Sequence, residues 1–268
     1  MMELYKEKIK MFCFDIDGTT FDHSSYSVRK LTLYALNELK KKNYKLCLCT
    51  GRARAEAVYL PKEFLKLMDG ISYSGGAEII IDNKIIKEEI NMDDVKRVTG
   101  YMDEKGVAYR YITIDDENYV NQVNKDYLKI FKDLYKVVPS IKNYQNERVI
   151  HINYYCDNSD YKSAIEKLSP NSLHVYMSKT SEISPLGADK GGALEKMANY
   201  FDLSKENVIA FGDSGNDISM FEKACVSVCM QNGSNSAKER ADYIADRIED
   251  DGLYKFLLDS GFIEVSEV

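Results

Sequence analysis

The sequence lacks the features of a membrane protein and of a nucleic-acid-binding protein. No apolar stretch approaches the ~20 residues that a membrane helix needs, and the N-terminus has no apolar signal core, so we expect a cytoplasmic protein without a membrane partner. Asp and Glu (43) outnumber Lys and Arg (36), and this net charge of −7 argues against non-specific binding of nucleic acid. No feature of the sequence indicates an obligate protein partner.

Metal-binding cysteine clusters and long linkers are also missing. The six cysteines lie mostly inside apolar runs, and no histidine accompanies Cys47 and Cys49, so we expect reduced core thiols rather than a zinc site. His151 and His174 lie in strand-like runs without obvious partners and are expected to be structural. Repeats, low-complexity tracts and Pro-rich linkers are absent from the sequence, so junctions between domains must be short.

The N-terminal part of the chain alternates strands with helices. Helices are expected to begin at Ser27 and near Ala53, between apolar strand-like runs. The strands are expected at residues 11–14, 45–49 and 71–74. This β-α-β-α-β order predicts a parallel, Rossmann-like sheet with right-handed crossovers, and a hairpin over 77–88 then leaves the sheet.

A second pattern follows and suggests an inserted lobe. Residues 89–183 are rich in Tyr, Asn, Lys and Asp, and alternation over 149–155 suits an antiparallel sheet with one face covered by helices. Helices are expected at 92–105, 125–135 and 159–168, and strands at 107–114, 148–155 and 173–177. The strand-helix alternation then resumes with a helix that opens at Lys190. We therefore predict an α/β protein with a discontinuous core domain (1–88 and 184–268) and an inserted α+β domain (89–183).

Four polar motifs follow predicted strands or open a helix. The apolar run Met11–Phe14 stops at two carboxylates, and Gly18 then lets the backbone turn out of the sheet. Because ligands bind at the carboxyl ends of strands in open α/β sheets, we expect the polar side chains of the four motifs to converge on one crevice. These side chains are Asp15, Asp17, Thr50, Lys190, Asp213 and Asp217.

This set of side chains can support phosphoryl transfer. Four carboxylates in one place repel each other, so the site should hold a divalent metal with oxygen ligands, and Mg²⁺ is the natural choice. Asp15 fits a nucleophile that attacks phosphorus, and Asp17 could protonate the leaving oxygen and then deprotonate the incoming water. Thr50 can donate to a phosphoryl oxygen, while Lys190 supplies positive charge between nucleophile and phosphate.

Each assignment also has a structural alternative. Asp15 and its neighbours could form a capped turn, Thr50 could cap the following helix, and Lys190 could be a solvated surface lysine. Asp213 and Asp217 could be a helix N-cap and a first-turn acid. The occurrence of all four motifs in one chain, in this order and each beside a predicted strand or helix, favours the functional interpretation.

The same residues resemble the haloacid dehalogenase superfamily of phosphotransferases. Its four motifs are Asp-x-Asp-x-Thr, a Thr or Ser that ends the second strand, a Lys, and Gly-Asp-x-x-x-Asp, and all four appear here in order. Thr-Gly-Arg at 50–52, the lobe between the second and third motifs, and the segment 212–220 are most similar to the Cof-type branch with a large α/β cap. The resemblance spans nearly the whole chain.

The resemblance implies a role for each matching residue. Asp15 would be the nucleophile and a metal ligand, Asp17 the acid/base that also offers its backbone carbonyl to Mg²⁺, and Asp213 the remaining carboxylate ligand. Asn216 and Asp217 would support metal and phosphate. Two positions depart from the family pattern: Ser74-Gly75-Gly76-Ala77 stands where Asn-Gly-Ala is common, and Thr20 where leucine is usual.

The function expected from these residues is a Mg²⁺-dependent phosphatase that acts on small phosphorylated metabolites, such as sugar phosphates or phosphorylated cofactors, through an aspartyl-phosphate. A phosphomutase resembling the phosphomannomutases is the nearest enzymatic alternative, and a phosphate-responsive signalling module similar to receiver domains is the alternative from another class. The inserted lobe would close over the site and select the substrate, or would be a rigid accessory or dimerisation lobe. Gly51, Arg52 and Lys179 are the candidate substrate-binding residues.

Overall fold

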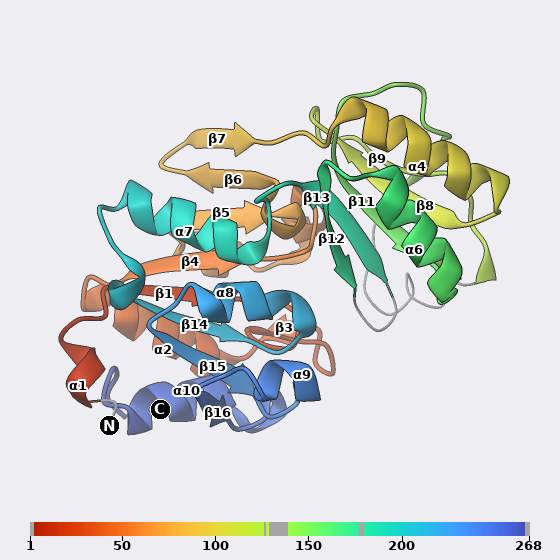
Figure 1. Cartoon of the computed structure of the whole chain (residues 1–268). Helices are drawn as coiled ribbons and strands as arrows, with labels where there is room; N and C mark the ends of the chain where they lie inside the picture. Colours follow the sequence, from red (N-terminus) through yellow and green to blue (C-terminus); the bar gives the residue numbers. More distant parts are fainter. Residues whose placement is uncertain (1–2, 126, 129–138, 177–179, 266–268) are drawn as a thin grey trace.

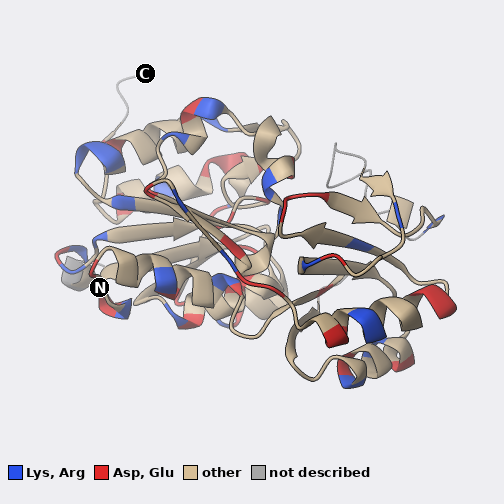
Figure 2. Ribbon diagram, turned by 90° about the horizontal axis from the view of Figure 1, so that it is seen from above, with Lys and Arg blue, Asp and Glu red and all other residues tan. Residues whose placement is uncertain are grey.

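The chain folds into two lobes, each built around its own sheet (Figure 1). This computed structural model describes residues 3–125, 127–128, 139–176 and 180–265. We call the lobe with the eight-stranded sheet the core lobe, and the lobe that runs from α4 (Met92–Glu104) to β13 (Ser181–Pro185) the cap lobe. Lys and Arg are interspersed with Asp and Glu on the outer helices of both lobes (Figure 2).

The core sheet confirms the predicted parallel arrangement. Its strand order is β16-β15-β14-β1-β4-β5-β6-β7, and the first six of these strands run parallel to one another. The strands are β1 (Met11–Phe14), β4 (Lys45–Cys49), β5 (Gly70–Tyr73), β6 (Glu78–Ile81), β7 (Lys84–Lys87), β14 (Val208–Gly212), β15 (Val226–Met230) and β16 (Tyr243–Ala245). β6 and β7 form the predicted hairpin around Asp82 and Asn83, which both adopt positive φ.

Helices cover both faces of the core sheet (Figure 1). In β1, Phe12 and Phe14 point into the apolar layer under α2 (Lys30–Lys41) and α10 (Gly252–Asp259). Met11 and Cys13 point to the other face, toward α7 (Lys190–Tyr200) and α8 (Ile218–Glu222). This two-sided burial explains the near-continuous apolar run at β1. The other helices of the core lobe are α1 (Glu3–Lys6), α3 (Lys62–Leu65), α7 (Lys190–Tyr200), α8 (Ile218–Glu222) and α9 (Asn235–Lys238).

Short elements connect the longer ones in the core lobe. A two-stranded ribbon of β2 (Phe21–Asp22) and β3 (Ser27–Val28) follows β1. Short 3₁₀ turns occur at η1 (Arg54–Tyr59), η2 (Ser74–Gly76), η3 (Lys205–Asn207), η4 (Gly215–Asp217) and η5 (Ile248–Asp250). No helix within the described part of the chain is both long enough and apolar enough to cross a membrane.

In its described residues, the cap lobe is a six-stranded sheet with two helices packed on one face. The strand order is β10-β9-β8-β11-β13-β12, and all neighbours are antiparallel except β9 and β10. Its elements after α4 are β8 (Ala108–Thr113), β9 (Asn118–Val120), β10 (Ser140–Ile141), β11 (Val149–Tyr155), α6 (Ser159–Leu168), β12 (Ser172–Tyr176) and β13. Asn91 and Asn158 cap α4 and α6 by accepting hydrogen bonds from two backbone amides each.

Several local predictions were wrong, for identifiable reasons. The first long helix begins at Lys30 because Ser27 is paired in β3, and the helix expected near Ala53 is the 3₁₀ turn η1, which ends just before Pro61. The cap sheet has helices on one face, as predicted, but all seven residues of β11 are buried because the core lobe packs against the second face. The helix expected at 125–135 lies largely outside the described residues.

The two lobes meet through buried polar contacts. The guanidinium of Arg110 in β8 pairs with Glu56 of η1, and both side chains are almost fully buried. A second ion pair joins Lys87 Nζ of the hairpin to Asp116 Oδ1 of the cap lobe at 2.7 Å. β13 continues to Pro185, two residues beyond the predicted domain boundary at 183, before the chain returns to the core at α7.

Candidate active site

A cleft of about 490 Å³ lies at the carboxyl ends of the central strands. Its core-lobe walls come from the loops after β1, β4 and β14, from the start of α7, and from the loop before α9. Its cap-lobe wall comes from β12 and β13 and includes Tyr176, Thr180 and Glu182. The four predicted motifs therefore meet where the parallel topology places strand ends.

The loop after β1 places Asp15 at the floor of the cleft. The amide of Asp15 donates to the carbonyl of Phe211, which continues the β1–β14 ladder up to this residue. Gly18 has φ +84°, and a Cβ there would overlap Asp213 Oδ2, so glycine is required both by the turn and by the neighbouring carboxylate. Thr20, at the position where leucine is usual in the family that the sequence resembles, donates its hydroxyl to the carbonyl of Asp15 at 2.9 Å.

Lys190 joins two of the carboxylates. It is the first residue of α7, whose N-cap Asp189 accepts a hydrogen bond from Gly192 N at 2.6 Å. Its Nζ donates to Asp15 Oδ1 and to Asp217 Oδ1, both at 2.6 Å, and the side chain is only 3% exposed. Burial opposes the charge, but the two carboxylates hold the pKa of Lys190 well above its usual range. Lys190 is therefore a charged group inside the site and not a surface lysine.

Both carboxylate oxygens of Asp217 accept hydrogen bonds from neighbouring protein groups, whereas Asp213 lines the cleft. The amides of Asp213 and Ser214 both donate to Asp217 Oδ2 at 2.8 Å, while Oδ1 accepts from Lys190. Asp217 therefore braces the loop after β14 and fixes Lys190. The carboxyl group of Asp213 lines the cleft opposite Asp15.

The carboxylates Asp15, Asp213 and Asp217 form a group that could hold a cation. One oxygen of each lies within 4.8 Å of the others. Burial, opposed by Lys190 and reinforced by Asp217 and Asp17, raises the pKa of Asp15 to about 7, and burial with the charges of Asp15 and Asp217 raises the pKa of Asp213 to about 9. This crowding of negative charge is what a divalent ion with oxygen ligands would relieve, so the residues fit Mg²⁺.

Asp17 is held away from this group by two basic side chains. Arg52 binds it in a bidentate pair, with Nε to Oδ2 at 2.8 Å and Nη2 to Oδ1 at 2.5 Å, and His23 Nε2 lies 2.8 Å from Oδ1. Burial would raise the pKa of Asp17, but these contacts lower it to about 2. The carboxyl group of Asp17 is thus ionised in this arrangement, and Arg52 also stacks over Phe21 at 5.0 Å.

Thr50 and Asn216 complete the predicted set. Thr50 is buried directly after β4, and its Oγ1 accepts a hydrogen bond from Arg52 N at 3.0 Å. It does not cap a helix, as the structural alternative expected, because η1 begins at Arg54 with Ala53 as its N-cap. The hydroxyl proton of Thr50 can still be donated, because accepting from Arg52 uses only an oxygen lone pair. Asn216 lines the cleft and accepts from Ser214 Oγ at 2.6 Å.

The structure brings most of the predicted site residues together. Those that line the cleft are Asp15, Asp17, Gly51, Arg52, Lys190, Asp213 and Asn216. Thr50 and Asp217 lie buried directly behind them, at 1% and 0% exposure. Lys179, the remaining candidate for substrate binding, lies outside the described residues.

Sequence reasoning missed His23 and the cap-lobe residues of the cleft. His23 follows Asp17 by six residues, but no spacing rule links a histidine in a loop of this kind to a carboxylate. Tyr176, Thr180 and Glu182 reach the cleft only through the packing of the cap lobe on the core lobe, which no local pattern encodes. β13 gave no such signal, because Ile183 is the only apolar residue of 179–184.

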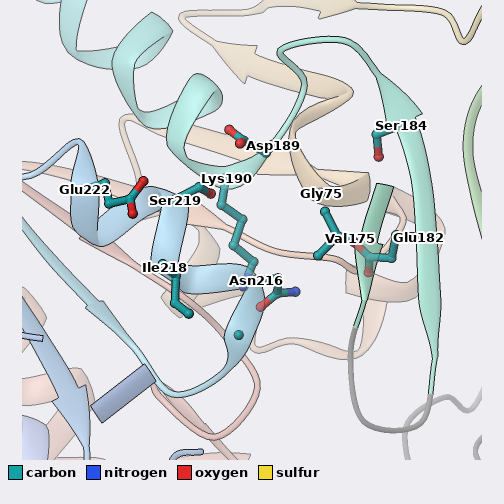
Figure 3. Close-up of a pocket in the computed structure, with 11 residues that line it drawn as sticks. Gly75, Val175, Glu182, Ser184, Asp189, Lys190, Asn216, Ile218, Ser219 and Glu222 are labelled. Carbon is teal, nitrogen blue, oxygen red and sulfur yellow. The ribbon is translucent and has the colours of Figure 1, made fainter. Parts of the chain in front are cut away.

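A second pocket of about 250 Å³ adjoins the cleft (Figure 3). Lys190 extends from α7 into this pocket toward Asn216, and Glu182 lies across the pocket on β13 (Figure 3). Four residues line both pockets: Glu182, Lys190, Gly215 and Asn216. The site is thus larger than the part that surrounds Asp15.

Comparison with known proteins places these residues in a family context. A family model described as haloacid dehalogenase-like hydrolase matches residues 12–257. The 5-amino-6-(5-phospho-D-ribitylamino)uracil phosphatase of Bacillus subtilis is 26% identical over 253 residues, which is 92% of this chain and 94% of that protein. A phosphoglycolate phosphatase of Picrophilus torridus is 24% identical over 94% of this chain and 91% of its own length.

Two solved structures share both lobes. A protein described in work on a trigonal-bipyramidal intermediate in a phosphoryl-transfer superfamily superposes with a TM-score of 0.89 at 25% identity, covering 95% of this chain and all of that one. A sugar phosphatase of HAD subclass IIB superposes with a TM-score of 0.87 at 26% identity over the same shares of the two chains.

Proposed function

Because this chain belongs to the haloacid dehalogenase-like hydrolases, we propose that it hydrolyses small phosphorylated metabolites with Mg²⁺ and through an aspartyl-phosphate at Asp15. The protein is a phosphatase of phosphoric monoesters. The observation that carries the finer proposal is the convergence of Asp15, Lys190 and Asp213 at the floor of one cleft.

Asp15 and Asp213, with the backbone carbonyl of Asp17, are the groups that would hold the ion. Mg²⁺ would neutralise the charge of the bound phosphoryl group and of the two carboxylates. Asp217 would not be a direct ligand, because both of its oxygens already accept hydrogen bonds from Lys190 and from the backbone.

In the first step, one carboxylate oxygen of Asp15 attacks phosphorus. A bond forms between that oxygen and phosphorus, the bond from phosphorus to the ester oxygen breaks, and Asp17 gives a proton to the departing oxygen. Lys190 fixes Asp15 through Oδ1, and Lys190 and the hydroxyl of Thr50 would stabilise the charge on the phosphoryl oxygens.

In the second step, water attacks the phosphorus of the aspartyl-phosphate. Asp17 takes a proton from the water, the bond between phosphorus and Asp15 breaks, and inorganic phosphate leaves. The ionised carboxylate of Asp17 suits this second step. The first step needs Asp17 to be protonated, so we propose that Arg52 shifts from Asp17 to the phosphoryl group of the bound substrate before the first step.

The substrate class we propose is that of sugar phosphates or phosphorylated cofactors. The named substrates of the relatives, a phosphorylated ribitylaminouracil in one and a sugar phosphate in another, support small polar phosphate esters. We also propose that the cap lobe covers the site during turnover and that the protein works in the cytoplasm. All six cysteines are free thiols, the state typical of reducing compartments, which supports the location.

Release of inorganic phosphate tests the proposal. The purified protein is assayed with Mg²⁺, with EDTA and with added Mg²⁺ after EDTA, against p-nitrophenyl phosphate and a panel of metabolite phosphates. We expect activity that EDTA removes and Mg²⁺ restores, and that Asp15→Asn lowers by more than about a hundredfold. A phosphomutase would instead return the phosphoryl group to sugar and would need a bisphosphate activator, so free phosphate from a hexose phosphate alone excludes it.

A further inference from the structure

Glu182 is a buried carboxyl group that the cap lobe inserts into the catalytic cleft. It projects from β13, is only 4% exposed, and lines both the cleft and the adjoining pocket (Figure 3). Among the described residues of the cap lobe that reach the cleft, it is the charged one, since its neighbours there are Tyr176 and Thr180. None of the proposed chemical steps uses it.

The core lobe makes room for this carboxyl group with two glycines. A Cβ added at Gly51 would lie 3.3 Å from Glu182 Oε1, and a Cβ added at Gly75 would lie 3.3 Å from Oε2. Gly51 follows Thr50 directly, and Gly75 lies in the turn after β5, so both loops border the phosphate site. The space for Glu182 therefore exists because two neighbouring loops carry no side chain at these points.

A chain of polar contacts behind Glu182 fixes its position. Asn153 Nδ2 donates to Glu182 Oε1 at 3.4 Å, and Asn153 Oδ1 accepts from Arg110 at 2.6 Å. Arg110 in turn pairs with Glu56 of the core lobe, and His151 Nε2 lies 4.0 Å from Glu182 Oε1. A carboxylate can accept about four hydrogen bonds. Among the described residues only Asn153 donates to Glu182 within 3.5 Å, so Glu182 can accept further hydrogen bonds from a ligand.

Each basic side chain among the described cleft residues is paired with a carboxylate, so none is left to bind an anionic leaving group. Lys190 lies 2.6 Å from Asp15, and Arg52 and His23 lie 2.5 Å and 2.8 Å from Asp17. The other polar side chains that line the cleft are the carboxyl groups of Asp213 and Glu182, the amide of Asn216 and several hydroxyl groups. These hydroxyl groups belong to Tyr176, Thr180, Ser214, Ser234 and Ser236.

We propose that Glu182 recognises the leaving group, by accepting hydrogen bonds from its hydroxyl groups and by repelling a carboxylate in the same place. The substrate class is then a sugar or polyol phosphate whose leaving group is neutral and rich in hydroxyls, and not a phosphorylated acid such as phosphoglycolate. This inference rests on the proposed phosphatase function. Burial, opposed by Lys190 and Arg110, raises the pKa of Glu182 to about 7, so its carboxylate repels a second one above about pH 7, and the two substrates are compared in that range.

The test compares two substrates that differ at one end. Erythritol 4-phosphate ends in a hydroxymethyl group, and 4-phosphoerythronate carries a carboxylate in its place. For the wild-type protein with Mg²⁺ we expect a kcat/KM ratio above about ten in favour of the polyol, because one charge repulsion or lost hydrogen bond of about 1.4 kcal/mol changes the ratio tenfold. Hydrolysis of p-nitrophenyl phosphate in parallel reports the phosphatase function itself.

Two variants separate charge from hydrogen bonding. Glu182→Gln keeps an acceptor and removes the charge, so we expect the preference for the polyol to fall about tenfold, mainly through a lower KM for the erythronate. Glu182→Asp keeps the charge and withdraws it from the cleft, so the KM for the polyol should rise while the erythronate stays a poor substrate. Thermal unfolding confirms that each variant is folded, and either variant alone can decide the question.

Glu78→Gln is the matched control. Glu78 is also a buried carboxyl group near the junction of the lobes, at 1% exposure, but it pairs with Arg54 and does not line the cleft. We expect it to keep the wild-type ratio. An equal change of the ratio in Glu78→Gln, or no change in either Glu182 variant, overturns the proposal. A wild-type protein that cleaves p-nitrophenyl phosphate but prefers the erythronate also overturns it and leaves the phosphatase function standing, whereas no cleavage of any ester contradicts the function.

Discussion

The stabilising effect of Mg²⁺ should grow with pH, because it depends on two carboxyl groups with raised pKa values. A carboxyl group whose pKa is higher in the folded than in the unfolded protein favours folding at low pH, and that contribution is lost as pH rises from the unfolded value through the folded one. For Asp15 and Asp213 this window runs from about 4 to about 7 and about 9. A bound divalent ion removes the penalty by stabilising both ionised groups.

The expected size follows from the shift of Asp15. One pKa unit corresponds to about 1.4 kcal/mol, so a rise from 3.8 to about 7 corresponds to roughly 4 kcal/mol. The pKa shift of Asp213 comes partly from the same repulsion between Asp15 and Asp213, so it does not contribute a separate free energy. For a chain of this size, roughly 4 kcal/mol changes Tm by on the order of 10 °C. We expect Mg²⁺ to raise Tm little at pH 5 and by up to this amount near pH 9.

The assay is thermal unfolding from pH 5 to 9, with Mg²⁺ or with EDTA at each pH. His151 has its pKa lowered to about 3 by burial and by Arg110, so it adds stability that is lost as pH falls below about 6.5. This effect of His151 is the same with Mg²⁺ and with EDTA, so it cancels when the Tm measured with EDTA is subtracted from the Tm measured with Mg²⁺. Asp213→Asn is the control variant and should abolish the pH-dependent part. An effect of Mg²⁺ that is constant across the range would refute the reasoning.

Three further predictions concern single residues. Asp17→Asn protein should still accept a phosphoryl group from p-nitrophenyl phosphate, because this leaving group needs no protonation, but rapid-quench experiments should show hydrolysis of the intermediate slowed at least about a hundredfold. Equal slowing of phosphorylation and of hydrolysis would argue against the role of Asp17 as acid and base. Gly76→Ala should lower the free energy of unfolding in urea by at least about 2 kcal/mol, because Gly76 has φ +114° and a Cβ there would overlap a backbone carbonyl at the start of α7. An unchanged midpoint of the urea unfolding curve would show that the turn can adjust. Arg110→Met should cost roughly 3 to 5 kcal/mol because it leaves Glu56 buried and unpaired, and adding Glu56→Gln should recover part of the loss; a double variant no better than the single one would contradict this account of the junction.

The catalytic half of the site could be predicted from sequence because its geometry is local. Asp15, Thr50 and Asp213 each follow a strand of one parallel sheet, so topology alone brings them to one edge. The apolar run before Asp15 and the helix start at Lys190 are short-range signals. The parallel core and the haloacid dehalogenase fold were confirmed on this basis.

The rest depends on contacts between distant segments, which local patterns do not encode. β13 carries Glu182 into the cleft only because the cap sheet packs on the turn that contains Gly75. The alternation over 149–155 predicted the strand but not the surroundings of Asn153, which is buried beside Arg110 where Arg110 pairs with Glu56 across the junction. Ser27 failed as a helix start because its pairing in β3 took precedence over its capping propensity.

The central claim is that Asp15 carries the phosphoryl group, and trapping the intermediate tests it most directly. Asp17→Asn protein is mixed with p-nitrophenyl phosphate and Mg²⁺, quenched in acid, digested and analysed by mass spectrometry, with Asp15→Asn treated in the same way. We expect one phosphoryl group on the peptide that contains Asp15, and none in the Asp15→Asn protein. A phosphoryl group on another residue, or steady turnover by the Asp15→Asn protein, would contradict the claim.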